Sequence, residues 1–192
     1  MQRRRTLKQY RAMDLTLFAL MLVVFETLLI RVSTGWFPNE PWTVSVTAAI
    51  TGIVMVRWGP WAAIHAVIGG AAFCAANRGG WQQYLIYCVG NTAALAMLPL
   101  LKRWGWEKLH TSVLANLAYG FGTLLLMQAG RAAVAMLLGY TPAAAAGFIT
   151  TDVINYIFTL TILWIAARLD GMLEDQKHYL RRINDPHHGE GE

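Results

Sequence analysis

The chain has 192 residues, of which 56% are hydrophobic and only 14% are charged, and its formal net charge is +5. A soluble domain carries about a quarter charged residues, and the apolar residues here form blocks close to the roughly 20 residues that cross a bilayer. These proportions exclude an ordinary soluble domain and indicate a protein that crosses the membrane several times. The basic balance is typical of loops facing anionic lipid, which we prefer to nucleic-acid binding as its explanation.

The predicted elements begin with a basic cytoplasmic tail at residues 1–13, followed by a membrane domain at residues 14–170 and a cytoplasmic C-terminal tail at residues 171–192. No small-residue cleavage pattern closes the first apolar stretch, so we expect it to remain in the mature protein. Backbone groups in hydrocarbon need internal partners, and the alternating polarity of a barrel is absent. The predicted fold is therefore an all-α bundle of six transmembrane helices, at residues 15–32, 44–56, 61–76, 84–101, 113–138 and 143–167.

The orientation follows from the lysines and arginines, which mark cytoplasmic loops. They gather in the two tails and in the turns "RWGPW" and "KRWGWEKLH", whereas the other connections carry only Arg31 and Arg78 at their margins. Six spans with both termini in the cytoplasm satisfy this rule at every loop. The connections "TGWFPNEPWT", "NRGGWQQY" and "GYTPAAAAGF" are then predicted to face outward.

Four ionisable residues fall within the predicted spans, where charges are costly and are often functional. Arg131 and Asp152 both lie in the outer half, and two interpretations stay open: a structural ion pair joining two helices, or contacts to a polar ligand in an outward-open cavity. The same choice applies to Glu26. His65 sits among small residues and is typical of a packed, hydrogen-bonded histidine.

The outward connections combine aromatic rings with polar groups, and an apolar pocket with a few polar groups is what a small-molecule site needs. Tryptophans at a membrane interface also serve as plain anchors, but the interleaved Asn39 and Glu40 favour a binding role in the first loop. In the last span, helical spacing puts Asp152, Asn155 and Tyr156 on one face. The predicted ligand-binding residues are Trp36, Phe37, Asn39, Glu40, Trp42, Asn77, Arg78, Trp81, Gln128, Arg131, Asp152, Asn155 and Tyr156.

Small residues form a stripe in the third span, at Ala62, Ala66 and Gly70. Such a stripe lets helices approach closely, either within this chain or against a partner subunit. The two cysteines, Cys74 and Cys88, each lie in an apolar run and support neither a disulfide framework nor a metal site. We expect no cofactor and no metal.

Motifs of catalysis are absent from the sequence. It contains no G-x-x-x-x-G-K-[ST] phosphate loop, no H-E-x-x-H and no G-x-S-x-G. We therefore expect a protein that is not an enzyme and that does not hydrolyse ATP through a phosphate loop.

Three stretches resemble a known family. The turn and helix "VRWGPWAAIHAVIGGAA", the last span "TDVINYIFTLTILWIAARLDG" and the tail "LEDQKHYLRR" are similar to the substrate-binding S component of energy-coupling factor (ECF) transporters. The resemblance implies a six-helix bundle in the bacterial cytoplasmic membrane that binds a vitamin or related micronutrient near its outer face, with the first outer loop as a lid. It also implies as partners a transmembrane coupling subunit and two ATPase subunits.

One departure from the family concerns docking. Members that share a coupling subunit carry Ala-x-x-x-Ala on the cytoplasmic part of helix one, where this chain has Ala12 followed by Thr16, and Ala19 followed by Val23. The resemblance therefore implies docking at Ala12, Thr16 and Ala19, with the stripe of the third span as a possible supplement. The aromatic residues of the outer loops favour a flat ring such as that of riboflavin or thiamine, whereas charges of both signs leave the ligand's charge open.

Three rival functions remain. A non-transporting scaffold of cell-shape or wall-synthesis machinery would need no ligand, and the aromatic and polar outer loop argues against it. An autonomous secondary transporter or channel would often show internal repeats, and none is visible. An intramembrane enzyme would need a catalytic grouping, which the sequence does not supply.

Overall fold

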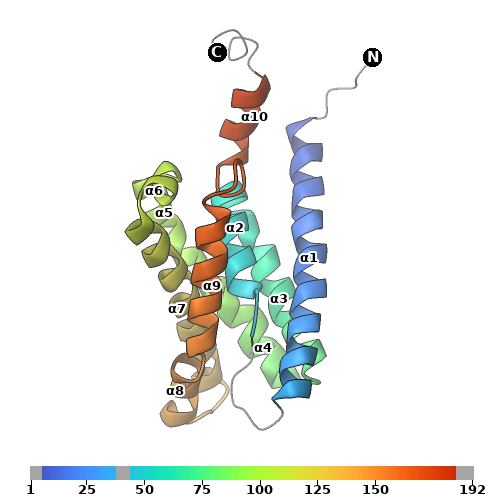
Figure 1. Ribbon diagram of the computed structural model, residues 1–192. Helices are drawn as coiled ribbons and strands as arrows, with labels where there is room; N and C mark the ends of the chain where they lie inside the picture. Colours follow the sequence, from blue (N-terminus) through green and yellow to red (C-terminus); the bar gives the residue numbers. More distant parts are fainter. Residues whose placement is uncertain (1–5, 38–43, 185–192) are drawn as a thin grey trace.

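The computed structural model describes residues 6–37 and 44–184, and the described part is helical without any strand (Figure 1). Ten α-helices and two 3₁₀ segments follow one another along it. They are α1 (Leu7–Trp36), α2 (Thr47–Trp58), η1 (Gly59–Trp61), α3 (Ala62–Ala76), α4 (Trp81–Gly90), η2 (Asn91–Met97), α5 (Leu98–Trp104), α6 (Glu107–Thr111), α7 (Val113–Leu137), α8 (Pro142–Thr150), α9 (Val153–Ala166) and α10 (Gln176–Asn184). The all-helical class predicted from the sequence is confirmed for these residues.

Within the described residues, five helical stretches are long and apolar enough to cross a membrane. They are Leu7–Trp36, Thr47–Ala76, Trp81–Trp104, Val113–Leu137 and Pro142–Ala166. This supports a multi-pass membrane protein. The second stretch combines α2, η1 and α3, which the sequence predicted as two spans, so the number of crossings stays a prediction.

The turn "RWGPW" reverses the chain between α2 and α3. Gly59 has a φ of +61°, a left-handed conformation that glycine adopts without strain, and the next residue is Pro60, which cannot donate a backbone hydrogen bond. The two helices then run antiparallel, since Gly69 in α3 lies against the Thr47 side chain at the start of α2. The reversal predicted from the sequence is present.

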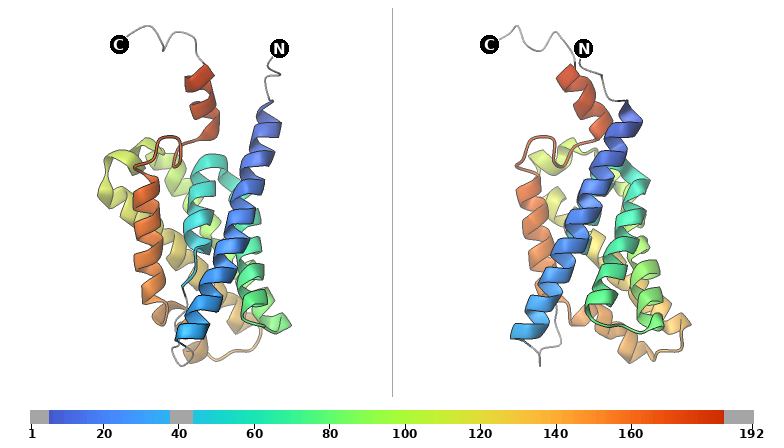
Figure 2. Two further views of the ribbon diagram at one scale, coloured as in Figure 1. Left: turned by 45° about the vertical axis from the view of Figure 1, so that its right-hand side comes forward. Right: turned by 90° about the vertical axis from the view of Figure 1, so that its right-hand side faces the viewer.

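The two ends of the bundle differ in charge. One end, which we call the basic end, holds Arg57, Lys102, Arg103, Lys108 and Arg168. Both termini of the described chain, α6 and α10 lie there, and α1 extends past the bundle on the same side (Figures 1 and 2). The opposite end carries α8 and the connection between α3 and α4. This agrees with the alternation of loops expected from the charges, whereas the direction across a membrane stays a prediction.

Helix α2 forms the centre of the bundle, and all twelve of its residues are buried. Helices α1, α3, α7 and α9 all contact it. Its sequence, rich in alanine, valine and isoleucine on every side, is typical of a helix without a solvent face. The Tyr119 hydroxyl of α7 donates a 2.8 Å hydrogen bond to the carbonyl of Gly52, which joins the two helices.

Two glycines allow α3, α4 and α7 to approach closely. A side chain at Gly90 would overlap the backbone of Gly130 and Arg131, and one at Gly70 would overlap the backbone of Tyr87. The remainder of the small-residue stripe, Ala62 and Ala66, is fully buried. The stripe packs within the chain, so its placement lends no support to docking there.

Two helices expected to be continuous are interrupted. The span predicted at residues 84–101 changes to the 3₁₀ segment η2 from Asn91 onward, and the span predicted at 143–167 breaks at Thr151 and Asp152 between α8 and α9. Both breaks coincide with polar side chains that bond across the bundle: Asn91 contacts Ala66 and Arg131, and Asp152 contacts Gln128. Side-chain hydrogen bonds of this kind compete with regular helix geometry.

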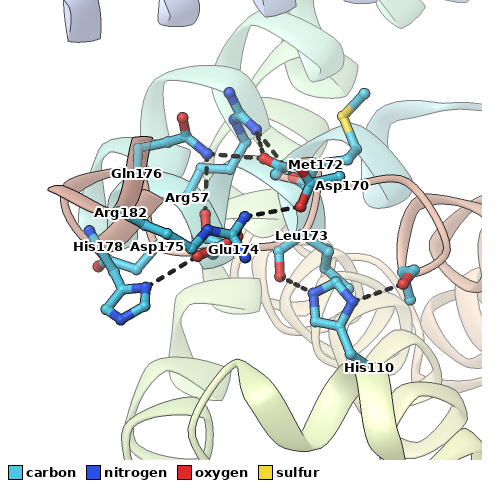
Figure 3. Close-up of polar contacts among 12 residues, drawn as sticks. Arg57, His110, Asp170, Met172, Leu173, Glu174, Asp175, Gln176, His178 and Arg182 are labelled. Carbon is cyan, nitrogen blue, oxygen red and sulfur yellow. Dashed lines mark hydrogen bonds and ion pairs between the residues drawn. The ribbon is translucent and has the colours of Figure 1, made fainter. Parts of the chain in front are cut away.

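At the basic end, Arg57 joins three parts of the chain. Its guanidinium forms a 2.8 Å ion pair with Asp14 of α1, and it donates to the carbonyls of Gly171 and Met172 (Figure 3). Trp58 donates to the same carboxylate from its indole nitrogen at 2.6 Å. The Arg57 and Asp14 side chains are only 8% and 10% exposed, so each depends on the other to offset the cost of burying its charge.

Replacing Arg57 with alanine therefore leaves the buried carboxylate of Asp14 without its opposite charge, and only the Trp58 indole still donates to it. We expect Arg57→Ala to lower the free energy of unfolding by about 3 kcal/mol, measured by denaturation of the detergent-solubilised protein. Arg103→Ala, at an exposed position of the same end, is the matched control and is expected to change it by less than about 0.5 kcal/mol. Equal effects of the two substitutions would contradict this assignment.

Candidate ligand-binding site

A polar cavity of about 370 Å³ lies at the end of the bundle opposite the basic end. Its lining comes from the end of α3, from α4, from α8 and from the break before α9. The lining residues are Phe73, Asn77, Gln83, Tyr87, Phe148, Thr151 and Asp152. A volume of this size is in the range of small-molecule pockets.

Aromatic rings form one side of the cavity. Phe73 and Tyr87 are stacked, with ring centroids 4.3 Å apart and planes inclined by 21°. Phe148 meets Tyr87 edge-on, with the centroids 6.0 Å apart. Such pairs hold rings in fixed orientations, so this wall presents a pre-formed aromatic surface beside the polar groups.

Arg131 of α7 lies next to the cavity and connects its polar and aromatic sides. Its Nε donates to Asn91 Oδ1 at 2.7 Å, and its Nη1 lies 3.6 Å from Asp152 Oδ2. The guanidinium carbon stands 4.7 Å from the centre of the Tyr87 ring, within the range of a cation–π contact. The Arg131 side chain is only 7% exposed, whereas that of Asp152 is 17% exposed.

Asp152 is the acidic group that lines the cavity. Its Oδ1 accepts from Asn155 at 2.9 Å, and its Oδ2 accepts from Gln128 at 3.4 Å. The Tyr156 hydroxyl in turn donates to Gln128 Oε1 at 2.5 Å. A carboxylate accepts up to about four hydrogen bonds, so Asp152 retains capacity for a donor from a ligand.

The residues that precede α2 are fixed to the same end of the bundle by side chains. The Ser45 amide donates to Asn155 Oδ1 at 2.7 Å, and the Val46 amide donates to Glu26 Oε2 at 2.9 Å. The amides at the start of a helix have no partner within the helix, and these two side chains supply acceptors to the amides just before it. Glu26 is fully buried, and its contacts fit the structural alternative of the two that the sequence left open.

Six of the predicted ligand-binding residues are brought together by the fold, either on the cavity wall or in the network beside it. They are Asn77, Gln128, Arg131, Asp152, Asn155 and Tyr156.

Four other predicted residues lie at this end of the bundle but do not line the cavity: Trp36, Phe37, Arg78 and Trp81. Trp36 and Trp81 are 75% and 68% exposed, as expected of interfacial anchors. The predicted residues Asn39, Glu40 and Trp42 lie outside the described residues.

The sequence did not single out the aromatic wall, Phe73, Tyr87 and Phe148, nor the partner of Arg131, Asn91. Gln83 and Tyr87 are four residues apart, and Asn91 follows at the same interval, so one helical stripe carries a polar, an aromatic and a polar residue. This spacing in an otherwise apolar span is the signal that was available.

His65 illustrates the opposite case. It is fully buried, and its Nε2 lies 3.0 Å from the carbonyl oxygen of Leu15 in α1. It is a packed histidine between α3 and α1, as its sequence context predicted, and it does not line the cavity.

Comparisons with known proteins identify no relative: the chain matches no family model, no curated protein and no solved structure. The function therefore has to be argued from the site itself.

The role of the Arg131–Asp152 contact can be measured with a double-mutant cycle. We expect Arg131→Gln and Asp152→Asn each to destabilise the protein and the pair to show a coupling free energy of about 2 kcal/mol, because both groups are shielded from water. Unfolding of the two single variants and the double variant in detergent gives this value. A coupling below about 0.3 kcal/mol would show that the two residues act independently, and the structural ion-pair interpretation would then be wrong.

Proposed function

We propose that the chain is the membrane-embedded substrate-binding component of an ECF-type importer in the bacterial cytoplasmic membrane, with six crossings and both termini in the cytoplasm. The observation that carries the proposal is the cavity near one end of the bundle, which combines an aromatic wall with the carboxylate of Asp152. A scaffold protein has no need of such a cavity.

The ligand we propose is a vitamin or related micronutrient with a flat ring system. Phe73, Tyr87 and Phe148 supply aromatic surface, and rings of this kind favour stacked or edge-on contacts with a ring of the ligand. Asn77, Gln83 and Asp152 supply hydrogen-bonding groups, which give orientation and specificity. Riboflavin is the first compound to test, followed by thiamine.

The proposed partners are a transmembrane coupling subunit and two ATPase subunits. A groove of about 600 Å³ follows α1 near the basic end and includes Ala12, Thr16 and Leu17 in its lining. Ala12 and Thr16 are exposed, so they are accessible to another subunit. The sequence has no phosphate loop, and an importer built from this chain would take its energy from such partners.

Binding can be tested on the purified protein with a panel of vitamins, followed through quenching of tryptophan fluorescence. We expect one aromatic vitamin to bind, and Phe148→Ala to weaken its binding about tenfold through the lost ring contact. Asp152→Asn is expected to weaken it ten- to a hundredfold because the charged acceptor is lost. Trp36→Ala tests whether the end of α1 contributes to binding of the vitamin.

The matched control is Trp104→Phe, since Trp104 ends α5 near the basic end, away from the cavity. We expect its affinity to equal that of the unchanged protein. Absence of binding across the whole panel, together with a stable complex with wall-synthesis or cytoskeletal proteins, would support the scaffold alternative instead. Mass spectrometry of small molecules retained after gentle purification identifies the ligand directly.

A further inference from the structure

The connection between α9 and α10 folds over the basic end, and a histidine of α6 binds it at two points. We call residues 168–175 the strap. His110 Nδ1 lies 2.6 Å from the carbonyl oxygen of Ala167, just before the strap, and Nε2 lies 2.8 Å from the carbonyl oxygen of Leu173 within it. Figure 3 shows the ring with contacts on opposite sides.

Both partners of His110 are acceptors that cannot donate. A neutral imidazole carries one N–H and one bare nitrogen, whereas the imidazolium carries two N–H groups. Two contacts to carbonyl oxygens at hydrogen-bonding distance can both be hydrogen bonds only if the ring is protonated. In the neutral ring, the bare nitrogen would face a carbonyl oxygen, and the two lone pairs would repel each other.

The position of the ring favours the positive charge for a second reason. Ala167 is the C-terminal cap of α9, and the carbonyls at the end of a helix carry a partial negative charge that attracts cations. Leu173 is fully buried, so its carbonyl gains most from a strong, charge-assisted partner.

Other charged and titratable groups surround this contact on every element packed against it. They are Glu107 and Lys108 on α6, Arg168, Asp170, Glu174 and Asp175 in the strap, Lys177, His178, Tyr179, Arg181 and Arg182 on α10, and Arg57 on α2 with its partner Asp14 on α1. Glu174 is almost fully buried, but its carboxylate accepts from Arg182 at 3.0 Å and lies 3.0 Å from Nδ1 of His178. Its charge is thus balanced within the strap and α10 rather than by His110.

The strap therefore has two anchors of different kinds. Arg57 donates to the carbonyls of Gly171 and Met172, and an arginine stays charged at all physiological pH values. His110 holds the two flanking positions, and histidine is the side chain whose charge changes near neutrality. His178 lies against the side chain of Glu174 and against the ring of Trp106, with ring centroids 5.2 Å apart. It bonds to no backbone carbonyl of the strap, unlike His110.

We propose that His110 is a proton-dependent latch: as the imidazolium it bonds to both the strap and the end of α9, and loss of its proton breaks one of these two bonds and loosens the strap, which Arg57 still holds at Gly171 and Met172. The sign follows from the acceptors, so the strap is fastened at the acidic side and loosened as pH rises. This proposal does not depend on the ligand or on the transporter assignment. It concerns only the basic end of the bundle.

The protonation state is tested first, by nitrogen NMR of histidine-labelled protein in detergent micelles. We expect one histidine at pH 6 to show the signature of two protonated ring nitrogens and to lose it as pH rises, and His110→Gln to remove that signal. A neutral tautomer of His110 at pH 6 would overturn the proposal.

Loosening of the strap is tested by amide hydrogen exchange at pH 6 and pH 8, with labelling times scaled to the intrinsic exchange rates. We expect exchange of residues 168–175 to be about tenfold faster at pH 8 than at pH 6, because one charge-assisted hydrogen bond is lost. In His110→Gln the exchange should be fast at both values. His178→Gln is the matched control and should retain the pH dependence.

Two outcomes would contradict the latch. If the pH dependence vanished in His178→Gln and persisted in His110→Gln, the wrong histidine would have been assigned. If the unchanged protein exchanged equally fast at both values, protonation would not fasten the strap. Amide exchange in α7 is measured in the same experiment. Faster exchange there indicates a general loss of structure, whereas unchanged exchange there indicates that only the strap is loosened.

Discussion

The central helix α2 is buried along its whole length, so the polar groups at both of its ends require partners inside the protein. At one end, the carboxylate of Glu26 and the amide of Asn155 accept from the backbone just before the helix. At the other end, the carboxylate of Asp14 accepts hydrogen bonds from the side chains of Arg57 and Trp58. Unpaired polar groups in such surroundings cost several kcal/mol. The positions of α1, α9 and the strap follow largely from this requirement.

The candidate site and the strap occupy the two ends of this same arrangement. Asn155 holds the backbone before α2 through one oxygen and donates to Asp152 through its nitrogen, so the cavity is connected directly to the start of the central helix. At the other end of α2, Arg57 connects the helix to Asp14 of α1 and to the strap. Each buried arginine serves as the junction between elements distant in sequence, which is a role suited to a donor with five N–H groups and a permanent charge.

Much of the fold could be predicted from the sequence because hydrophobic length and basic loops are local signals. The reversal at Gly59 and the proximity of Arg131 to Asp152 followed from the order and direction of the spans. The aromatic wall could not be predicted, because the sequence pattern around an apolar ring such as Phe73 in a membrane helix does not indicate whether the ring faces lipid or a cavity. The breaks at Asn91 and Asp152 depend on partners in other helices, and Glu26 gave no sign that it would bind the backbone amide of Val46, just before α2.

The segment η2 has a consequence for the shape of the helix that contains it. A 3₁₀ helix rises about 2.0 Å per residue where an α-helix rises about 1.5 Å, so the seven residues of η2 lengthen the Trp81–Trp104 stretch by about 3.5 Å. Its period of three residues per turn also aligns Asn91, Ala94 and Met97 in a single row, and these are its buried residues. A straight α-helix would rotate Ala94 and Met97 progressively off that line. The row keeps one polar anchor and two apolar contacts in register against α7, and insertion of a single residue there would turn it toward lipid.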